Sequence, residues 1–263
     1  MSYPKVKPHP YDGFQCEGKP KGRYTEYGGI PTYTVVPGIS IGSFERKYNG
    51  VGLLYLSDKS GICHDSMMLA DQFAEVGLHT IICDYVGSAT DPNKQKLKTA
   101  HRSEAAARKI IDDTIKDLID GQFGGTKRNR ILIAGFGCGV RHVLRLLAQP
   151  DTPQGHVFVA GFIASPDAEP VGSVLDYSAI SKPLSLAFAD DRNTVTKGEE
   201  RERIRDALLT WSGPYQINIY SHVRDNFAVR RAVASKAEVY AKRQAFAQAL
   251  QWFNFHLFGN ELR

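Results

Sequence analysis

The residues from Ile131 to Val140 carry the most informative spacing for chemistry in this chain. The run Ile131-Leu-Ile-Ala-Gly-Phe-Gly-Cys-Gly-Val140 follows an apolar start with three alternating glycines, Gly135, Gly137 and Gly139. A helical pattern comes next, so the stretch predicts a buried strand, a sharp turn and a helix. A turn of the pattern Gly-x-nucleophile-x-Gly holds a reactive side chain in strained backbone geometry at its apex. Here the apex is Gly137, and a cysteine, Cys138, stands one place later.

Strands and helices alternate along the chain and must position these groups. Apolar runs predict strands at 32–36, 52–57, 79–84, 130–134, 157–163, 184–188 and 216–220. Helical periodicity and capping residues predict helices from Ser66 to Gly77, after Ser103, from Val140, over 198–209, and from Ser235 to Gly259. This alternation predicts an α/β fold, a mostly parallel sheet of about seven or eight strands with helices on both faces.

Polar residues beyond the carboxyl ends of the strands are the candidate binding groups, because ligands of such sheets bind there. They suit hydrogen bonding to a small-molecule substrate, and they are Lys59, Ser60, His64, Tyr85, Gly137, Cys138, His222 and Arg230. Two carboxylates, Asp191 and Asp225, also follow the last two predicted strands.

Composition limits the classes of function. The chain has 263 residues, 42% of them hydrophobic and 23% charged, which predicts one globular domain over 1–263. The sequence lacks a long apolar run and a secretory signal, so we expect no membrane partner. Four scattered cysteines indicate a reduced, cytoplasmic protein. We expect a monomer or a homodimer. The basic run Lys94 to Lys98 has no interleaved aromatic residues, so we expect no nucleic-acid partner.

Two segments are expected to be irregular. Residues 1–30 are rich in proline, glycine and charge and predict an irregular N-terminal arm, with Cys16 as a small buried or half-buried group. Residues 164–182 predict a lid-like loop, since a loop of that length in a compact domain is often functional. No metal or cofactor is expected. The glycines lack the third position of a dinucleotide-binding turn, and the histidines lack the spacing of metal ligands.

Several stretches together resemble the dienelactone hydrolase family of α/β-hydrolases, in its fungal branch. They are Cys16-Glu-Gly-Lys-Pro-Lys-Gly22 with Tyr33, Leu56-Ser-Asp-Lys-Ser-Gly61 followed by Leu69-Ala-Asp-Gln72, Asp84-Tyr85, the turn Gly135 to Gly139, Tyr220-Ser-x-Val223, Phe227-Ala-Val-Arg230, and Tyr240-Ala-Lys242 with Trp252-Phe253. The similarity covers nearly the whole chain and implies an α/β-hydrolase fold.

The resemblance implies hydrolysis of lactones and esters by a Cys–His–Asp triad, and each position can be checked. The aspartate position is filled, with Asp190 and Asp191 competing and Asp191 aligning better. The nucleophile position holds Gly137, and the histidine position holds Asp225. By the resemblance, Asp225 and Asp191 are therefore the candidate catalytic groups. Acyl transfer needs a nucleophile with a base in hydrogen-bond reach, and two of these three positions are substituted.

Alternatives remain open at these positions. Cys138 and His222 could form a shifted dyad, or Cys138 could pack as a small apolar residue. Gly137 could only relieve backbone strain in a decayed relative. Asp225 and Asp191 could face each other, so that one holds its proton near neutral pH, or Arg224, Arg230 or Lys59 could pair with Asp225.

The expected function is non-hydrolytic. We expect a cyclase or isomerase, such as a Diels-Alderase or another pericyclase, acting on an apolar polyketide- or terpenoid-like metabolite. Fungal relatives of the family often serve such pathways, which is an argument by association. One alternative is an ester or dienelactone hydrolase that uses Cys138. Another is a non-catalytic binding or scaffold protein.

Overall fold

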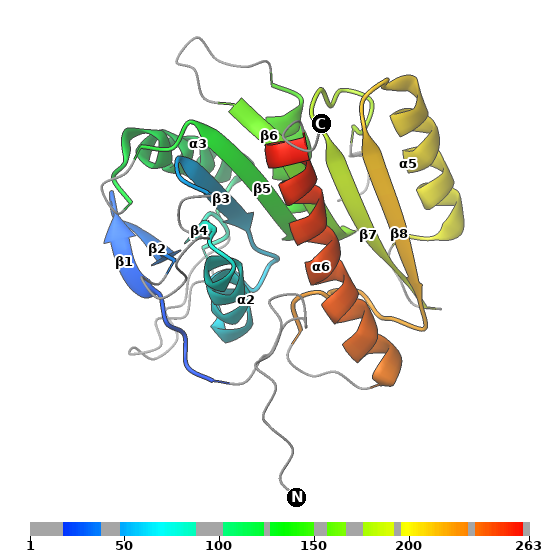
Figure 1. The fold of residues 1–263 in the computed structure, drawn as a ribbon, viewed down its shortest axis with the longest axis horizontal. Helices are drawn as coiled ribbons and strands as arrows, with labels where there is room; N and C mark the ends of the chain where they lie inside the picture. Colours follow the sequence, from blue (N-terminus) through cyan, green and yellow to red (C-terminus); the bar gives the residue numbers. More distant parts are fainter. Residues whose placement is uncertain are drawn as a thin grey trace, which may run out of the picture.

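The computed structural model describes residues 18–37, 48–87, 102–123, 127–149, 157–166, 176–191, 196–230 and 235–259. Within them, eight strands form one sheet in the order β1-β2-β4-β3-β5-β6-β7-β8 (Figure 1). The strands are β1 (Arg23–Tyr27), β2 (Ile30–Val35), β3 (Val51–Leu56), β4 (His79–Cys83), β5 (Arg130–Gly137), β6 (Val157–Pro166), β7 (Leu184–Asp190) and β8 (Tyr215–Ser221). The pairs β1–β2 and β2–β4 are antiparallel, and the other five pairs are parallel. The predicted mostly parallel sheet is confirmed.

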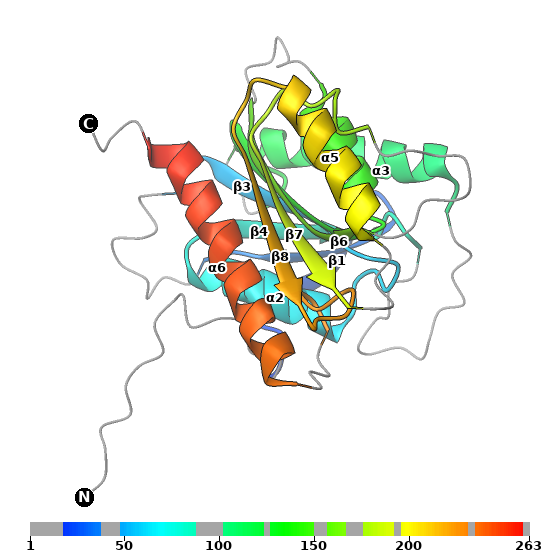
Figure 2. The same ribbon diagram turned by 90° about the vertical axis from the view of Figure 1, so that its right-hand side faces the viewer.

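Five described helices cover the two faces of the sheet, as Figure 2 shows edge-on. Helices α2 (His64–Glu75) and α6 (Lys236–Phe258) pack on one face, and α3 (Glu104–Asp120), α4 (Val140–Leu147) and α5 (Gly198–Thr210) pack on the other. Successive strand residues separate accordingly: Tyr55 joins the core with α2 and α6, whereas Leu54 joins the core with α3 and α4. The continuous apolar runs of β3 and β5 follow from this, because both of their faces are buried.

Capping residues set the helix ends close to where the sequence predicts them. The Ser103 hydroxyl accepts a hydrogen bond from the Ala106 amide (3.3 Å), and Ser235 accepts one from the Glu238 amide (3.2 Å). Helix α2 begins at His64, two residues before the predicted Ser66. The cause is that Ser66 lies inside the first turn, where its hydroxyl accepts from the Cys63 amide (2.9 Å).

The prediction of an irregular arm over 1–30 is wrong for its last part. Strands β1 and β2 form a hairpin whose two-residue turn is Gly28 and Gly29, with φ of 57° and 76°. A Gly-Gly pair between two strand-like runs is a hairpin signal, and the sequence prediction overlooked it. Residues 1–17, with Cys16, lie outside the described residues, as does the basic run 94–98.

The predicted lid-like loop 164–182 is described only in part. Its first three residues belong to β6, and 167–175 lie outside the described residues. Near its end, the Asp176 carboxylate accepts from the amides of Ser178 (2.9 Å) and Ala179 (3.2 Å). The part that is described therefore includes an ordered turn before β7.

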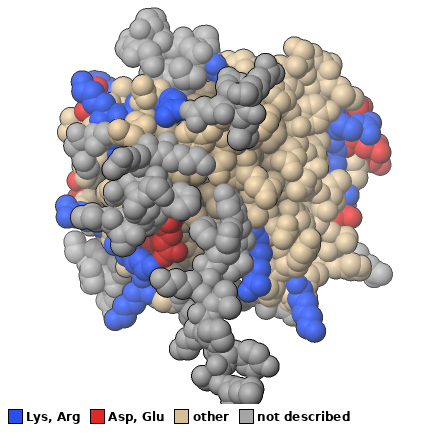
Figure 3. Space-filling model, viewed as in Figure 1, with Lys and Arg blue, Asp and Glu red and all other residues tan. Residues whose placement is uncertain are grey.

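The surface over α6 carries few charges. On the face seen in Figure 3, uncharged residues occupy much of the described surface around this helix. Tyr240 and Phe255 of α6 and Ile219 of β8 are exposed large hydrophobic residues. None of the helices in the described ranges combines the length and hydropathy that a bilayer crossing requires.

One buried polar cluster joins the start of β4 to the segment before β5. The His79 Nδ1 atom accepts from Arg128 Nη2 (2.7 Å), and its Nε2 atom lies 3.0 Å from Thr34 Oγ1. Because Nδ1 accepts, we assign the ring proton to Nε2, which then donates to Thr34. Burial, together with the charge of Arg128, lowers the pKa of His79 from 6.5 to about 4.

This cluster predicts a loss of stability in mild acid. The folded pKa of His79 lies below its ordinary value, so the unfolded chain binds more protons as the pH falls from about 6.5 to about 4. His79→Gln should therefore flatten the dependence of unfolding free energy on pH in this window, by up to about 1.4 kcal/mol per pH unit. Burial also lowers the pKa of His142 to about 4, so some slope should persist.

Urea unfolding at a series of pH values measures this slope. Thr34→Val is the matched control, since it removes the Nε2 hydrogen bond and leaves the titrating ring in place. It should lower stability by a similar amount at every pH. A His79→Gln slope equal to that of the parent protein would contradict the prediction.

Candidate functional site

The strand, turn and helix predicted around Gly137 are present. Strand β5 ends at Gly137, whose φ is 51°, and α4 begins three residues later at Val140. The Gly139 amide donates to the Phe136 carbonyl (2.8 Å), which closes the turn tightly. A side chain at Gly137 would be held in the left-handed region, where glycine is the least strained residue.

The two flanking glycines permit the close packing of this turn. A Cβ atom on Gly139 would lie 2.4 Å from the Leu56 carbonyl oxygen, a backbone atom of neighbouring β3. A Cβ atom on Gly135 would lie 2.3 Å from Cγ2 of Val143 in α4. Neither distance is compatible with a side chain in the present packing. The geometry that presents a residue at position 137 is therefore intact, although that residue has no side chain.

Cys138 directs its sulphur toward the ends of β3 and β4. Its Sγ atom lies 3.7 Å from the Tyr85 hydroxyl and 3.9 Å from the Ser57 carbonyl, which also accepts from Tyr85. Tyr85 is 3% exposed, and burial raises the pKa of its hydroxyl. Strands β3 and β4 lie on one side of β5, and β8, which precedes His222, lies on the other. A Cys138–His222 dyad would therefore require the Cys138 side chain to turn away from Tyr85 and Ser57.

The carboxylates after β7 have different surroundings. Asp190 forms an ion pair with Arg201 of α5, with 2.9 Å between Oδ1 and Nη2. Asp191 follows directly, and its charge acts on Arg224 in the loop after β8. The His222 amide donates to the Asp190 carbonyl (2.8 Å), which ties the ends of the two strands together. The structure thus brings the neighbourhood of Asp191 to the segment that carries Asp225.

The cationic group beside Asp225 in the sequence is bound elsewhere. Arg224 donates to both carboxylate oxygens of Glu238, at 2.8 Å and 3.3 Å. The Glu238 carboxylate is the main cause of the raised pKa of Arg224, and the charge of Asp191 adds to it. Of the pairings considered from the sequence, Arg224 with Asp225 is therefore disfavoured. Asp225 itself is half-buried.

The loop around Asp225 is fixed in place by backbone contacts. Asn226 has a φ of 62°, and its carbonyl accepts from the amides of Val229 (3.1 Å) and Arg230 (3.0 Å). The Lys242 ammonium of α6 donates to the carbonyls of Val229 and Arg230. The Arg230 side chain is exposed. These contacts hold the backbone that follows Asp225.

The loop between β3 and α2 carries the other predicted binding residues. Lys59 and Ser60 are exposed at its tip, where the Ser60 amide donates to the Asp58 carboxylate (2.9 Å). His64 begins α2, and its Nε2 atom lies 3.1 Å from the Gly18 carbonyl. His64 therefore contacts the N-terminal segment. Lys59 and Ser60 belong to the tip of the loop beside the turn from Gly135 to Gly139, which we call the elbow.

Three buried hydroxyl groups near the elbow were missed by the sequence analysis. The hydroxyls of Tyr55, Ser57 and Ser165 are buried, with no hydrogen-bond partner among the described residues. They lie at the carboxyl ends of β3 and β6, the two strands that pair with β5. Ser165 has a φ of 46°, an unusual conformation for serine. Buried polar groups normally have partners, so these hydroxyls are candidates for contacts to substrate or water. The sequence does contain a signal for these residues, because each is a polar residue at the end of an apolar run that predicts a strand next to β5.

Metal ligation finds no support in the described part of the chain, where no three His, Cys, Asp or Glu side chains gather closely enough to hold an ion. The arrangement can instead provide hydroxyl and carboxyl groups for hydrogen bonding and proton transfer.

Comparisons with known proteins give one protein family and several fungal relatives. The family model described as "Dienelactone hydrolase family" matches residues 44–257. Hydrolase tropI of Talaromyces stipitatus is 27% identical over 258 residues, covering 94% of this chain and 95% of that protein. Hydrolase pyvD of Aspergillus violaceofuscus is 28% identical over 250 residues, covering 92% and 93%. Dienlactone hydrolase 1 of Gibberella moniliformis is 25% identical over 253 residues, covering 91% and 90%.

Solved structures share the fold at low sequence identity. A crystal structure of a putative dienelactone hydrolase from Klebsiella pneumoniae has a TM-score of 0.60 at 16% identity, covering 88% of this chain and 97% of that one. A soluble variant of monoglyceride lipase from Saccharomyces cerevisiae has a TM-score of 0.63 at 12% identity, covering 91% and 96%. The α/β-hydrolase fold predicted from the sequence is confirmed.

Restoring the two substituted positions tests whether Gly137 and Asp225 meet. In a Cys138→Ser background, Gly137→Cys together with Asp225→His should be alkylated at the new thiol faster at pH 7 than Gly137→Cys alone. The new imidazole can pair with the thiolate, whereas Asp225 opposes its formation. We expect a rate difference of roughly tenfold, which corresponds to a thiol pKa lower by about one unit.

Mass spectrometry locates the label among the cysteines, and Gly137→Cys with Asp225→Asn is the matched control. It removes the carboxylate charge without adding a base, so its rate should fall between the other two. Equal rates in all three variants would mean that positions 137 and 225 do not meet.

Proposed function

The chain belongs to the dienelactone hydrolase family, and on this premise we propose that it is a non-hydrolytic enzyme, a cyclase or isomerase such as a pericyclase. The observation that carries the proposal is Gly137, which occupies the apex of an intact turn with a φ of 51° and no side chain. Hydrolysis by the family's triad needs a nucleophile at this apex and a histidine at position 225. The chain has a glycine and an aspartate there.

The retained packing around the turn supports a working site over a decayed one. Gly135 and Gly139 are still glycines, and each is needed for the close approach of β5, α4 and β3. The loop after β8 is still held by the Asp190 carbonyl and by α6. A site under no functional constraint has no need for a rigid frame around a missing nucleophile.

The proposed chemistry depends on positioning and on acid–base groups. Asp225 would donate or accept a proton, or hydrogen-bond a substrate carbonyl or hydroxyl, and Asp191 would act beside it. The hydroxyls of Tyr55, Ser57 and Ser165 would orient the substrate. A ring closure or isomerisation requires a folded substrate and a few fixed polar groups, and it requires no covalent nucleophile.

The substrate class is proposed from the resemblance. Fungal members of this family often serve pathways to polyketides and terpenoids, and relatives of this chain are fungal proteins. An apolar metabolite of that kind, with one carbonyl or hydroxyl, would match the few polar groups of the proposed site.

An ester or dienelactone hydrolase that uses Cys138 is the second candidate. The names of the relatives favour it, since they are called hydrolases. The direction of the sulphur, toward Tyr85 and the Ser57 carbonyl, opposes it. A non-catalytic binding protein is the third candidate, and the retained frame opposes that reading.

The protein should not hydrolyse esters or lactones. We expect no turnover of activated aryl esters or dienelactones above the rate in buffer, beside an active member of the family, because no nucleophile stands at the apex. Cys138→Ser should change nothing in this assay, and Cys63→Ser serves as the matched cysteine control. Turnover that disappears only in Cys138→Ser would establish the shifted nucleophile and end the non-hydrolytic proposal.

Asp225 should be required for the chemical step, measured as product formation once screening has identified the substrate. Loss of an acid–base group predicts a rate lower by about 10²–10⁴ in both Asp225→Asn and Asp225→Ala. A purely positioning role predicts that Asn is mild and Ala severe. The exposed carboxylate of Asp206 offers a control, and Asp206→Asn should keep the full rate. A full rate in Asp225→Ala would exclude this residue from the reaction.

A further inference from the structure

Strand β8 forms one edge of the sheet, and Figure 2 shows it between α5 on one face and α6 on the other. Among the described strands it has a single neighbour, β7. A sheet edge presents a row of backbone N–H and C=O groups that can pair with a further strand. Natural proteins usually protect such an edge with charged side chains, proline or a bulge.

The contacts with β7 show which backbone groups of β8 point outward. The Pro214 carbonyl accepts from the Leu184 amide (3.3 Å), and the His222 amide donates to the Asp190 carbonyl (2.8 Å). Both are even-numbered positions at the ends of β8, and successive residues of a strand direct their N–H and C=O groups to opposite sides. The odd-numbered residues therefore direct theirs away from β7, and they are Tyr215, Ile217, Ile219 and Ser221.

The sequence of β8 contains none of the usual edge protections. Tyr-Gln-Ile-Asn-Ile-Tyr-Ser has no charged residue and no proline, and its pairing with β7 runs without a bulge. The Ile219 side chain is 53% exposed. The edge strand at the other end of the sheet is different, because β1 carries Arg23 and Glu26 among its five residues. Of the two edge strands, β8 is therefore the one suited to pairing.

On the α6 side of this edge, an exposed aromatic ring lies beside β8. Tyr240 of α6 is 62% exposed. Burial is the main cause of the raised pKa of Tyr220, and the phenol of Tyr240 adds to it, so the two side chains are near each other. The Tyr220 hydroxyl donates to Gln248 of α6 (3.1 Å) and accepts from the Asn218 amide group (3.4 Å). This side thus presents amides and hydroxyls next to one exposed ring.

On the α5 side, the exposed residue is a leucine. Leu209 is 62% exposed, and it follows Arg205 by four residues, so both lie on the same side of the helix. The Asp206 carboxylate is the main cause of the raised pKa of Arg205, and Tyr215 contributes to it. That side of α5 therefore lies near the start of β8, and Leu209 extends the apolar surface of this edge.

Two copies of this edge complement each other when they run antiparallel about a two-fold axis at Asn218. In this register Ile217 of one copy pairs with Ile219 of the other, so apolar residues meet on the α5 face. On the α6 face Gln216 meets Tyr220, and the two Asn218 side chains meet each other. All four outward-facing residues then pair with outward-facing residues, and no like charges stand opposite each other.

We propose that the protein is a homodimer in which the β8 strands of two copies pair antiparallel, so that one sheet runs through both subunits. The self-complementary side chains of β8 favour a second copy of this chain over a different partner, since a two-fold interface uses the same surface on both subunits. A specific interface buries about 1,000 Å² or more. Tyr240 and Leu209 of each copy therefore contact the other copy beside the paired strands.

Sedimentation of the full chain over a range of concentrations tests the dimer. We expect twice the mass of the chain at about 10 µM and a dimer Kd of about 1 µM or below. Ile219→Lys places a charge on the edge and should raise the Kd at least a hundredfold. Val36→Lys adds the same charge at a residue that is 54% exposed after β2, and it should leave the Kd unchanged. Tyr240→Ala and Leu209→Ser should each raise the Kd about tenfold.

Cysteine cross-linking tests the register without weakening the edge. The two Asn218 residues form a pair without backbone hydrogen bonds, whose Cα atoms lie about 4.5 Å apart, within the range of a disulfide. Asn218→Cys should therefore give a covalent dimer on mild oxidation. Gln216→Cys is the matched control, because its two copies lie roughly 13 Å apart along the strands and should not cross-link. Circular dichroism of each variant checks that it is folded.

Three results would each overturn the proposal. The first is a parent protein that remains a monomer up to about 100 µM. The second is a folded Ile219→Lys variant that dimerises as tightly as the parent, or a Val36→Lys variant that dissociates as readily as Ile219→Lys. The third is a parent dimer in which Asn218→Cys forms no covalent dimer, or in which Gln216→Cys cross-links equally well.

Discussion

The close approach of β5, α4 and β3 at the elbow is the contact on which the candidate site depends. The backbone at Gly139 passes so near the Leu56 carbonyl that no Cβ atom fits between them, and Gly135 passes equally near Val143. This packing requires a tight turn, and the tight turn gives Gly137 a positive φ. A frame of this kind presents whatever side chain stands at its apex, and here it presents none.

Ion pairs and backbone contacts fix the segments after β7 and β8, which carry the other half of the candidate site. Arg201 binds Asp190, Arg224 binds Glu238, and the His222 amide binds the Asp190 carbonyl. Arg201 and Arg224 therefore stabilise the structure around the ends of β7 and β8. Asp191 and Asp225 lie in the same segments. Burial adds a second effect, because the hydroxyls of the neighbouring strand ends are removed from water. Polar groups held in this way are arranged in advance, which favours chemistry by positioning.

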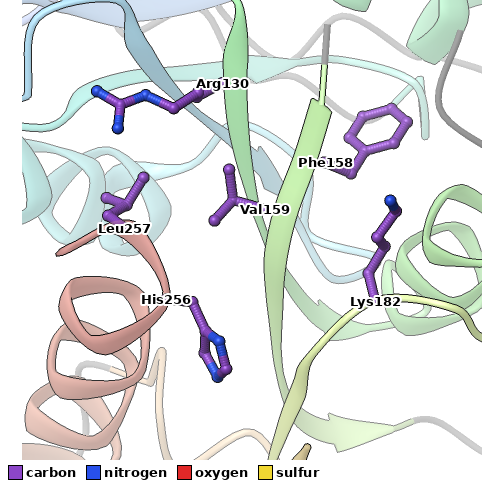
Figure 4. A pocket seen from close by; sticks show the side chains of 6 residues that line it. All are labelled: Arg130, Phe158, Val159, Lys182, His256 and Leu257. Carbon is purple, nitrogen blue, oxygen red and sulfur yellow. The ribbon is translucent and has the colours of Figure 1, made fainter. Parts of the chain in front are cut away.

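The two ends of the parallel strands differ in chemical character. The carboxyl ends of the strands carry the elbow, two carboxylates and buried hydroxyls. The amino ends of β5 and β6 border a cavity near the end of α6 (Figure 4), lined by Arg130, Phe158, Val159, Lys182, His256 and Leu257. Strand β5 connects them, with Arg130 at one end and Gly137 at the other.

The sequence by itself determined the fold, because the fold is encoded in local patterns. Alternating apolar runs and caps predicted the parallel sheet and its helices, and the spacing of Gly135, Gly137 and Gly139 predicted the turn. It missed strand β1, whose polar residues have little periodicity and which is stabilised by pairing with β2. Only the tertiary structure decided where side chains point and what they contact. The direction of the Cys138 sulphur, the pairing of Arg224 with Glu238 and the cavity beside His256 each join residues far apart in the chain, and no local pattern encodes such contacts.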